Sequence, residues 1–319
     1  MEGSLLKKIR YDNPIGVQVE LTGRCNLKCH HCYNSSGDFG RFDVTDDGWL
    51  KFFEELNKKY SFPTVNITGG EPLLRKELLF KILRLFSKYN PSTRVRIMTN
   101  GYYLDKVFLD TLSQFDNPID FQISLDGADK FEHQAVRIVK YSWEKAIDAC
   151  LMVVNSGYEL QMASTITSAN YEKIERLFKL AILVGANSLG IGSALPLGRG
   201  IQDKKGLILS ADIRNEVAHK LKELKKDYGS FLDINLTSSL DEVYNKYSNL
   251  TQDWLIVDHR GNVKIDTRLP YVVGNIMSLS IEELWMLVQQ KYTDSVVVTE
   301  ISKALSENTI ISNVERVLL

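Results

Sequence analysis

Between residues 15 and 195 the chain alternates short apolar segments with longer amphipathic ones, and this alternation constrains the fold more than any other feature. Short β-rich runs separated by segments with three- and four-residue apolar spacing are typical of βα units on a parallel sheet. The expected strands are Gly16 to Leu21, Thr64 to Thr68, Arg94 to Thr99, Asp120 to Leu125, Glu159 to Ile166 and Ser188 to Ala194. The expected helices are Asp46 to Tyr60, Lys76 to Tyr89, Asp105 to Phe115, Ser142 to Asn155 and Tyr171 to Val184. Six units are too few to close an eight-stranded barrel, so we expect an α/β fold built on a partial (β/α)6 TIM-like barrel, with its site at the carboxyl ends of the strands.

After Pro196 the rhythm changes, and the sequence predicts a second, small α+β unit. A hairpin signal lies in this unit, because two short apolar runs are joined by a turn that contains Gly261. A helix from Ser210 to Asp227 is expected before this unit, which begins near Phe231. The expected elements of the unit are the hairpin strands Trp254 to Val257 and Val263 to Asp266, a helix begun by a capping box of Ser280 and Glu283 that ends at Gln289, and a last helix from Glu300 to Leu319. The predicted organisation is an extension at 1–14, the barrel at 15–200, a linker and helix at 201–230, and the small domain at 231–319.

Composition places the chain among ordinary globular proteins and argues against several kinds of partner. Hydrophobic residues make up 44% of the 319 residues and charged residues 25%. The net charge of -1 gives no support for nucleic acid as an electrostatic partner. No apolar run approaches the roughly 20 residues that cross a bilayer, and Met1 to Ser4 opens no signal peptide. We therefore expect a cytoplasmic protein with no membrane or nucleic-acid partner.

Three of the four cysteines, Cys25, Cys29 and Cys32, lie within eight residues on the loop after the first expected strand. Three thiolates on a short loop can hold one corner of a cubane iron–sulfur cluster and leave one iron without a protein ligand. The alternative is a structural zinc site, which normally has four protein ligands and would recruit His30 or His31. Cysteines this few and this crowded do not form a disulfide framework, so they indicate a reducing compartment.

The cysteine run resembles the cluster loop of the radical SAM superfamily, CxxxCx(aromatic)C, with His31 in the aromatic position. The resemblance implies one [4Fe-4S] cluster held by Cys25, Cys29 and Cys32, with S-adenosylmethionine (SAM) chelated by the fourth iron. It also implies that one electron, from a flavodoxin- or ferredoxin-type donor, cleaves SAM to a 5'-deoxyadenosyl radical that abstracts a substrate hydrogen. Tyr33 follows the last cysteine, where the family commonly places an aromatic residue near the adenine.

A second motif, Gly69-Gly70-Glu71-Pro72, directly follows the second expected strand. Two glycines let a backbone approach a ligand closely, and the carboxylate beside them suits an ammonium group. The motif resembles the GGEP of the same family, which implies that Gly69, Gly70 and Glu71 hold the amino group of SAM. Taken alone the motif is a strand-ending turn; one βα unit after the cysteines it becomes a specific indication.

The later strand ends carry further resemblances to the same family. The TNG and S-x-D-G sequences that end the third and fourth strands imply that Asn100, Ser124 and Asp126 face the nucleoside or methionyl part of SAM. Thr165 on the fifth strand is expected near the ribose, and Arg199 in the P-x-G-R turn after the sixth is expected near the carboxylate. The alternative interpretation makes each an ordinary turn, cap or solvated residue.

The carboxyl-terminal hairpin, the Gly274-Asn275-Ile276 turn and the helix after it resemble the SPASM or twitch extensions of this family. In those extensions the second hairpin strand normally ends near a cysteine that ligates an auxiliary cluster. This chain has Thr267 near that point and no cysteine after Cys150, so we expect a degenerate extension that kept its fold and lost its metal. That loss favours redox-neutral outcomes such as epimerisation, elimination or rearrangement, or a bond formed with the electron returned to the first cluster.

These features predict a metal-binding radical SAM enzyme, an oxidoreductase by class, that modifies a ribosomally made peptide. The alternatives are a radical SAM enzyme that acts on a sugar, nucleotide or other small metabolite, and a non-catalytic metal-binding scaffold. Cys150 is the one spare thiol that could donate hydrogen in an epimerisation. It falls in an expected helix, however, where a small buried hydrophobic residue is the favoured interpretation.

Overall fold

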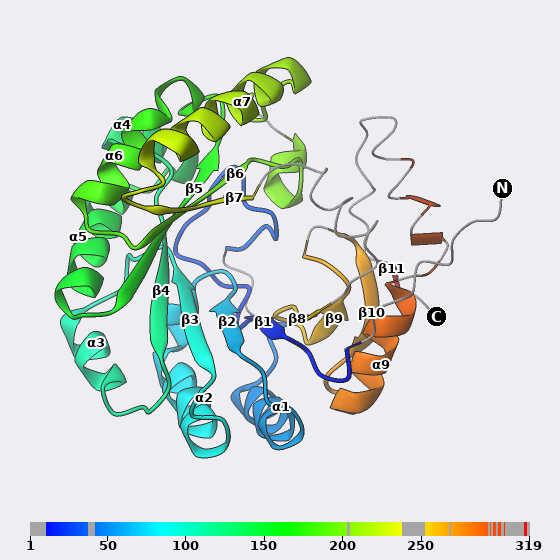
Figure 1. Cartoon of the computed structure of the whole chain (residues 1–319). Coiled ribbons are helices and arrows are strands. Elements are labelled where there is room, and N and C mark those ends of the chain that lie inside the picture. Colours follow the sequence, from blue (N-terminus) through cyan, green and yellow to red (C-terminus); the bar gives the residue numbers. More distant parts are fainter. Residues whose placement is uncertain are drawn as a thin grey trace.

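The computed structural model describes residues 11–37, 42–202, 205–237, 253–267 and 269–292, together with residues 294, 296–297, 299–300, 303 and 316–317. In this part of the chain eleven strands form one sheet. The sheet curves into an open arc, and helices cover its outer side (Figure 1). None of the described helices is long and apolar enough to cross a membrane.

Six consecutive parallel strands form the centre of the sheet and agree with the expected strands to within one residue at each end. They are β1 (Gly16–Glu20), β2 (Thr64–Thr68), β3 (Arg94–Thr99), β4 (Ile119–Ser124), β5 (Glu159–Ile166) and β6 (Ser188–Ser193). A seventh strand, β7 (Asp233–Thr237), pairs in parallel with β6. The sequence analysis placed that segment in the small unit, because a strand of five residues carries no signal of which neighbour it pairs with.

The helices between the strands follow the predicted alternation, with one addition. The predicted ones are α1 (Asp46–Lys59), α2 (Lys76–Tyr89), α3 (Lys106–Leu112), α5 (Ser142–Asn155), α6 (Glu175–Leu183) and α7 (Ala211–Tyr228). Short 3-10 turns, η1 (Pro72–Arg75), η2 (Tyr171–Lys173) and η3 (Gly198–Gln202), follow three strand ends. The addition is α4 (Lys130–Arg137), and Asp129 is its N-cap residue. The side chain of Asp129 accepts hydrogen bonds from the backbone N–H of Phe131 and Glu132. The apolar pattern did not predict α4, because this helix spans only eight residues, too few to show a clear period.

Alternating apolar residues of the strands build the core against the helices. Val17 and Val19 of β1 are fully buried, as are Trp49 and Phe53 of α1 and Phe86 of α2. The rings of Phe53 and Phe86 meet edge to face with centroids 5.7 Å apart. The helices therefore cover the outer face of the sheet. The predicted site residues lie at the carboxyl end of each strand, in the loops that follow it.

The carboxyl-terminal hairpin continues the same sheet on the other side of β1. Its first strand, β8 (Trp254–Val257), pairs in parallel with β1, so that Val19 lies opposite Val257. The remaining elements are β9 (Asn262–Lys264), β10 (Tyr271–Asn275), α9 (Ile281–Lys291) and β11 (Arg316–Val317). The turn between β8 and β9 therefore lies beside the carboxyl end of β1, next to the cysteine loop.

Local predictions for this segment have mixed outcomes. Gly261 has φ +83° in the hairpin turn, and the capping box of Ser280 and Glu283 begins α9, both as predicted. The helix expected from Glu300 to Leu319 is wrong at 316–317, which form β11, and most of its other residues lie outside the described part. The domain boundaries stay predictions, and residues 1–10 of the predicted extension also lie outside the described part.

Candidate functional site

A cavity of about 290 Å³ opens at the carboxyl ends of the parallel strands. We call it the cluster cavity, because all three loop cysteines line it. Eleven of the thirteen predicted site residues line it: Cys25, Cys29, His31, Cys32, Tyr33, Gly69, Gly70, Asn100, Ser124, Thr165 and Arg199. The other two, Glu71 and Asp126, are fully buried behind its wall.

The glycine pair of the second motif supports the cysteine loop from below. Gly70 donates a backbone hydrogen bond to the carbonyl of Thr22 at 2.6 Å, and Glu71 N–H donates to the carbonyl of Arg24 at 2.8 Å. A Cβ on Gly70 would lie 2.0 Å from the Arg24 carbonyl oxygen, and Gly69 has φ +138°. The loop can therefore lie this close to the strand end only because no side chains intervene.

The three thiols fit a cluster better than a single ion. Within the described residues no group of three or more His, Cys, Asp or Glu side chains is arranged to hold one metal ion. A cubane does not require such a group, because each cysteine thiolate binds a different iron. The zinc alternative would need His30 or His31 as a fourth ligand. His30 does not line the cavity, and Nε2 of His31 faces Asp126 Oδ2 at 3.5 Å, which leaves Nδ1 of His31 as the one candidate.

Burial and nearby cations set the electrostatics of the thiols. Burial raises the pKa of the Cys25 thiol to about 12 and that of Cys29 to about 11. Arg137 opposes this shift at Cys29, since its Nη1 lies 3.9 Å from the sulfur. Arg199 adds a second cation, donating from Nε to the Cys29 carbonyl at 2.8 Å. Two guanidinium groups beside the loop would offset the negative charge of a thiolate-bound cluster.

Asp126 is the centre of a buried network behind the cluster cavity. Its Oδ2 accepts from Arg137 Nε at 2.7 Å, and its Oδ1 accepts from the backbone N–H of Thr165 at 2.9 Å. Burial alone would raise the pKa of this carboxyl, but Arg137, His31 and His133 together outweigh burial and hold the pKa at about 2. The backbone N–H of Asp126 donates to Nδ1 of His133, whose pKa burial lowers to about 3. The network fixes the end of β4 and the position of Arg137, which itself lines the cavity.

Glu71 also works from behind the wall. One carboxylate oxygen accepts from Leu73 N–H at 3.0 Å and from Thr99 Oγ1 at 2.7 Å, and the other accepts from Asn100 N–H at 2.9 Å. Burial raises the pKa of this carboxyl. Glu71 therefore caps η1 and ties the glycine motif to the end of β3. The expectation that it holds the amino group of SAM stays a prediction.

Three donors and acceptors of the cluster cavity suit a polar ligand. Nη2 of Arg199, Nδ1 of His31 and Nδ2 of Asn34 are buried and have no hydrogen-bond partner among the described residues. All three side chains line the cavity. Buried polar groups in folded proteins are nearly always paired, so such a group indicates a binding function. A ligand with a carboxylate and a nucleoside, as SAM has, fits this donor set.

Arg137 and His133 are the functional residues that sequence reasoning missed. Both lie on α4, the helix that the apolar pattern did not predict. The available signal was Asp129, an N-cap residue two positions after the Gly127 that ends the Ser-x-Asp-Gly motif. A helix at that point brings side chains of its last turn back over the strand ends.

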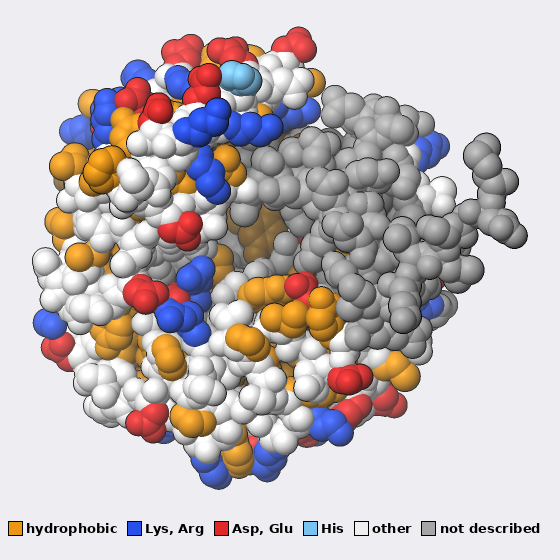
Figure 2. Space-filling model, in the orientation of Figure 1, with side chains coloured by type: hydrophobic (Ala, Val, Ile, Leu, Met, Phe, Trp, Pro, Cys, Tyr) orange, Lys and Arg blue, Asp and Glu red, His pale blue; other side chains and the backbone are white. Residues whose placement is uncertain are grey.

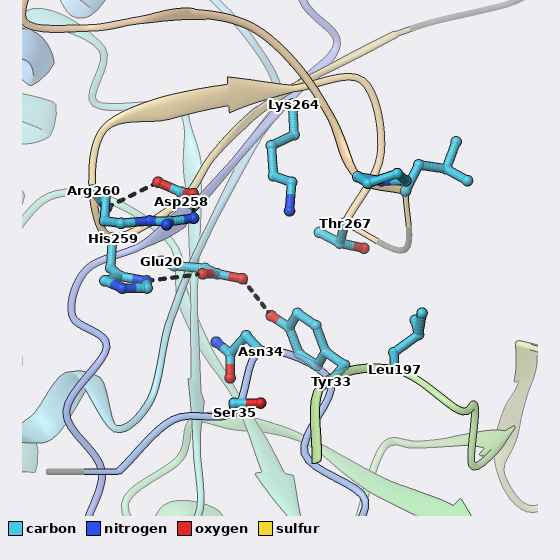
Figure 3. A pocket seen from close by; sticks show the side chains of 13 residues that line it. Glu20, Tyr33, Asn34, Ser35, Leu197, Asp258, His259, Arg260, Lys264 and Thr267 are labelled. Carbon is cyan, nitrogen blue, oxygen red and sulfur yellow. Dashed lines mark hydrogen bonds and ion pairs between the residues drawn. The ribbon is translucent and has the colours of Figure 1, made fainter. Parts of the chain in front are cut away.

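A second cavity, of about 370 Å³, adjoins the first (Figure 3). We call it the outer cavity. It lies between the cysteine loop, the segment at Leu197 and the β8–β9 turn, and it shares Tyr33, Asn34 and Thr267 with the cluster cavity. Lys264 of β9 and Thr267 point into it from the hairpin, with Tyr33 across from them (Figure 3). The hairpin thus forms one wall of a space that continues from the thiols.

Fold and site together define the class of protein: a partial barrel with three cysteines on one loop at the carboxyl ends of its parallel strands. The Radical SAM superfamily model matches residues 19–181, just over half of the chain. The chain therefore belongs to the radical SAM superfamily, and it is an enzyme of that class, as the sequence analysis expected.

Two maturation proteins are similar to this chain in sequence. The sporulation killing factor maturation protein SkfB of Bacillus subtilis (strain 168) is 27% identical over 224 residues, which cover 69% of this chain and 52% of SkfB. The mycofactocin maturase MftC of Mycolicibacterium smegmatis is 32% identical over 190 residues, which cover 59% of this chain and 47% of MftC. The chain thus spans about half the length of these relatives.

Solved structures share the fold. Native anSMEcpe with bound AdoMet has a TM-score of 0.67 at 19% identity and covers 88% of this chain and 82% of its own. Streptococcus suis SuiB bound to S-adenosylmethionine has a TM-score of 0.68 at 13% identity and covers 93% of this chain and 71% of its own. These similarities confirm the predicted partial TIM-like barrel.

Proposed function

We propose that this chain cleaves SAM reductively at a single [4Fe-4S] cluster and abstracts a hydrogen atom from a ribosomally made peptide. The observation that carries the proposal is the cluster cavity, where three thiols and eight further predicted SAM-binding residues line one space. When bound, the cluster and SAM would supply the 5'-deoxyadenosyl radical.

The residues have separate tasks in this proposal. Cys25, Cys29 and Cys32 would each bind one iron of the cluster. Arg199 has an unpartnered buried Nη2 that would donate to the SAM carboxylate, while Nε holds the loop through the Cys29 carbonyl. Arg137 would place a second positive charge beside the same sulfur. Gly69 and Gly70 would expose strand-end backbone to the amino group.

The cysteine inventory supports the proposal of a single cluster. Cys150 is fully buried on α5, its pKa is raised to about 12 by burial, and no cysteine follows it in the sequence. The carboxyl-terminal hairpin would therefore act as a cluster-free SPASM-like cap. Without a second cluster to accept an electron, a redox-neutral modification such as epimerisation, elimination or rearrangement is the favoured outcome. The buried position of Cys150 argues against its use as a hydrogen donor.

A peptide substrate is supported by the kinds of relative. SkfB and MftC are maturation proteins by name, and SuiB has been solved bound to its precursor peptide SuiA. The outer cavity, open beside the thiols, offers space for a substrate segment. The electron would come from a flavodoxin- or ferredoxin-type donor in the cytoplasm.

Anaerobic reconstitution tests the proposal. We expect about four irons per chain, an absorbance that dithionite bleaches, and release of 5'-deoxyadenosine from SAM. Cys25→Ala should abolish all three, whereas Cys150→Ala should retain them. Mass spectrometry of short peptides encoded beside the gene then tests the substrate. One zinc per chain without 5'-deoxyadenosine would refute the enzyme assignment.

A further inference from the structure

Three side chains from separate segments form a chain that links the hairpin to the cysteine loop. The hydroxyl of Tyr33 donates to Oε1 of Glu20 at 2.8 Å. Nδ1 of His259 lies 3.6 Å from the other oxygen of the same carboxylate. Figure 3 shows the three groups in a row, with His259 on the β8–β9 turn, Glu20 at the end of β1 and Tyr33 directly after the last cysteine.

The fold places His259 there by main-chain contacts. Parallel pairing of β1 with β8 aligns Val19 with Val257, so the residues that follow each strand lie side by side. The carbonyl of His259 accepts from Val44 N–H at 2.9 Å. The imidazole packs on Gly23, where a Cβ would lie 2.7 Å from the ring. The ring is therefore held at the rim of the cysteine loop.

The charges favour an ion pair between His259 and Glu20. Glu20 is 6% exposed, and the acidic residues that act on His259 are Glu20, Asp258 and Asp43, while Arg260 is the neighbouring cation on the same turn. Asp258 already accepts from Arg260 and Asn262 of its own turn, and Asp43 accepts from Thr22 and Gly23. Burial would lower the pKa of His259, but its acidic neighbours, Glu20 above all, outweigh burial and raise it. The His259 ring thus faces a carboxylate that has little water around it, and this contact favours the protonated form of the imidazole.

Tyr33 connects the row of His259, Glu20 and Tyr33 to the two cavities. It is one of three residues that line both the cluster cavity and the outer cavity. Its hydroxyl is fixed by Glu20, while 38% of the residue is exposed, so the Glu20 contact determines where the ring stands. Any movement of Glu20 would change the wall between the two cavities.

We propose that His259 is a positioning residue, which acts through Glu20 to hold Tyr33 as the wall between the SAM-binding space and the outer cavity. The inference rests on the proposed binding of SAM in the cluster cavity. It assigns the carboxyl-terminal hairpin a part in SAM binding, although the hairpin itself supplies no ligand to the cluster.

Kinetics of SAM cleavage by the dithionite-reduced holoenzyme, without peptide, test the proposal. We expect His259→Gln to raise the KM for SAM about fivefold, which corresponds to about 1 kcal/mol, with kcat changed less than about twofold. Tyr33→Phe breaks the same chain at its other end, so the double variant should be no worse than either single variant. In the wild type the KM should rise with pH as the imidazolium is lost, and in His259→Gln it should not. Additive effects, or an unchanged KM in His259→Gln, would overturn the proposal.

A readout independent of turnover is hydrogen–deuterium exchange of the cluster-loaded protein without SAM. His259→Gln should speed exchange in residues 31–37 of the cysteine loop as well as in the hairpin turn. Faster exchange in the turn alone would overturn the proposal. A wild type that cleaves no SAM would instead count against the proposed function, and the exchange experiment would still test the role of His259. His219→Gln is the matched control, because His219 faces Glu223 on the surface of α7, and it should change neither readout. If His259→Gln fails to retain iron, Glu20→Gln takes its place with the same expected results.

Discussion

Arg137 and Asp126 form a buried ion pair, with the arginine Nε 2.7 Å from Oδ2 of the carboxylate. The two residues come from different elements, α4 and the loop after β4, and the exposed fractions of their side chains are 10% and 0%. The pair orients Arg137 so that Nη1 faces the sulfur of Cys29. A cation beside the proposed cluster thus depends on an anion behind the cavity wall.

Arg137→Met should destabilise the fold by roughly 3–5 kcal/mol, because it leaves the Asp126 carboxylate buried without its partner. Urea unfolding followed by circular dichroism under anaerobic conditions measures the loss. The control is Lys51→Met, which breaks an exposed pair with Glu55 and should change stability by less than about 1 kcal/mol. Similar losses in the two variants would contradict the role of burial.

His133 should make the protein lose stability as the pH falls. Its folded-state pKa is lowered to about 3, while the unfolded chain takes up the proton below about 6.5. The unfolded state therefore binds more protons between these values, and stability falls by about 1.4 kcal/mol per pH unit as the pH is lowered through that window.

The variant that tests this is His133→Asn, which removes the titrating group and keeps an acceptor for the backbone N–H of Asp126. Between pH 6 and pH 4 its free energy of unfolding should depend on pH less steeply than that of the wild type, by about 1.4 kcal/mol per unit. Equal slopes would show that His133 is protonated in the folded state.

The barrel could be predicted from sequence because its signals are local. The strand ends at Thr68, Thr99 and Ile166 agree with the structure, since each apolar run stops where the polar loop begins. The same holds for the cavity lining, because parallel strands bring their carboxyl ends to one edge, and motifs that follow each strand meet there. The order of the strands, together with the family resemblance of the motifs that end them, therefore predicted most of the proposed SAM site.

The sequence could not show which distant strands pair or how deeply a motif residue is buried. Nothing local indicates that β8 lies beside β1, and so neither the outer cavity nor the contact of His259 with Glu20 was predictable. Depth is a second limit, because Asp126 and Glu71 occupy motif positions yet are buried behind the wall. A motif identifies the residue at a strand end. The hydrogen bonds of that residue depend on helices such as α4, whose position is determined by tertiary packing.

Glu71→Ala should destabilise the protein by roughly 2–4 kcal/mol and weaken SAM binding. The substitution leaves the buried N–H of Asn100 and the hydroxyl of Thr99 without their acceptor, and each unsatisfied group costs about 1–3 kcal/mol. Thermal unfolding and calorimetric titration of SAM into the cluster-loaded protein measure the two effects. Glu77→Ala, an exposed substitution on α2, is the control and should leave both unchanged. Full stability in Glu71→Ala would show that these donors find other acceptors.

Gly70→Ala should prevent the cysteine loop from holding iron. The new Cβ would lie 2.0 Å from the carbonyl oxygen of Arg24 and 3.1 Å from Cβ of Cys25, and backbone atoms at such a distance cannot move aside cheaply. The loop must then shift, which separates Cys25 from the other two cysteines. Iron per chain after anaerobic reconstitution should fall several-fold below that of the wild type. Gly190→Ala is the matched control, since its Cβ meets the side-chain end of Gln161 at 3.3 Å and its nearest backbone atom, the Met162 oxygen, at 4.0 Å, and it should bind iron normally. Iron binding in Gly70→Ala equal to that of the control would mean that the loop does not depend on contact with the glycine motif.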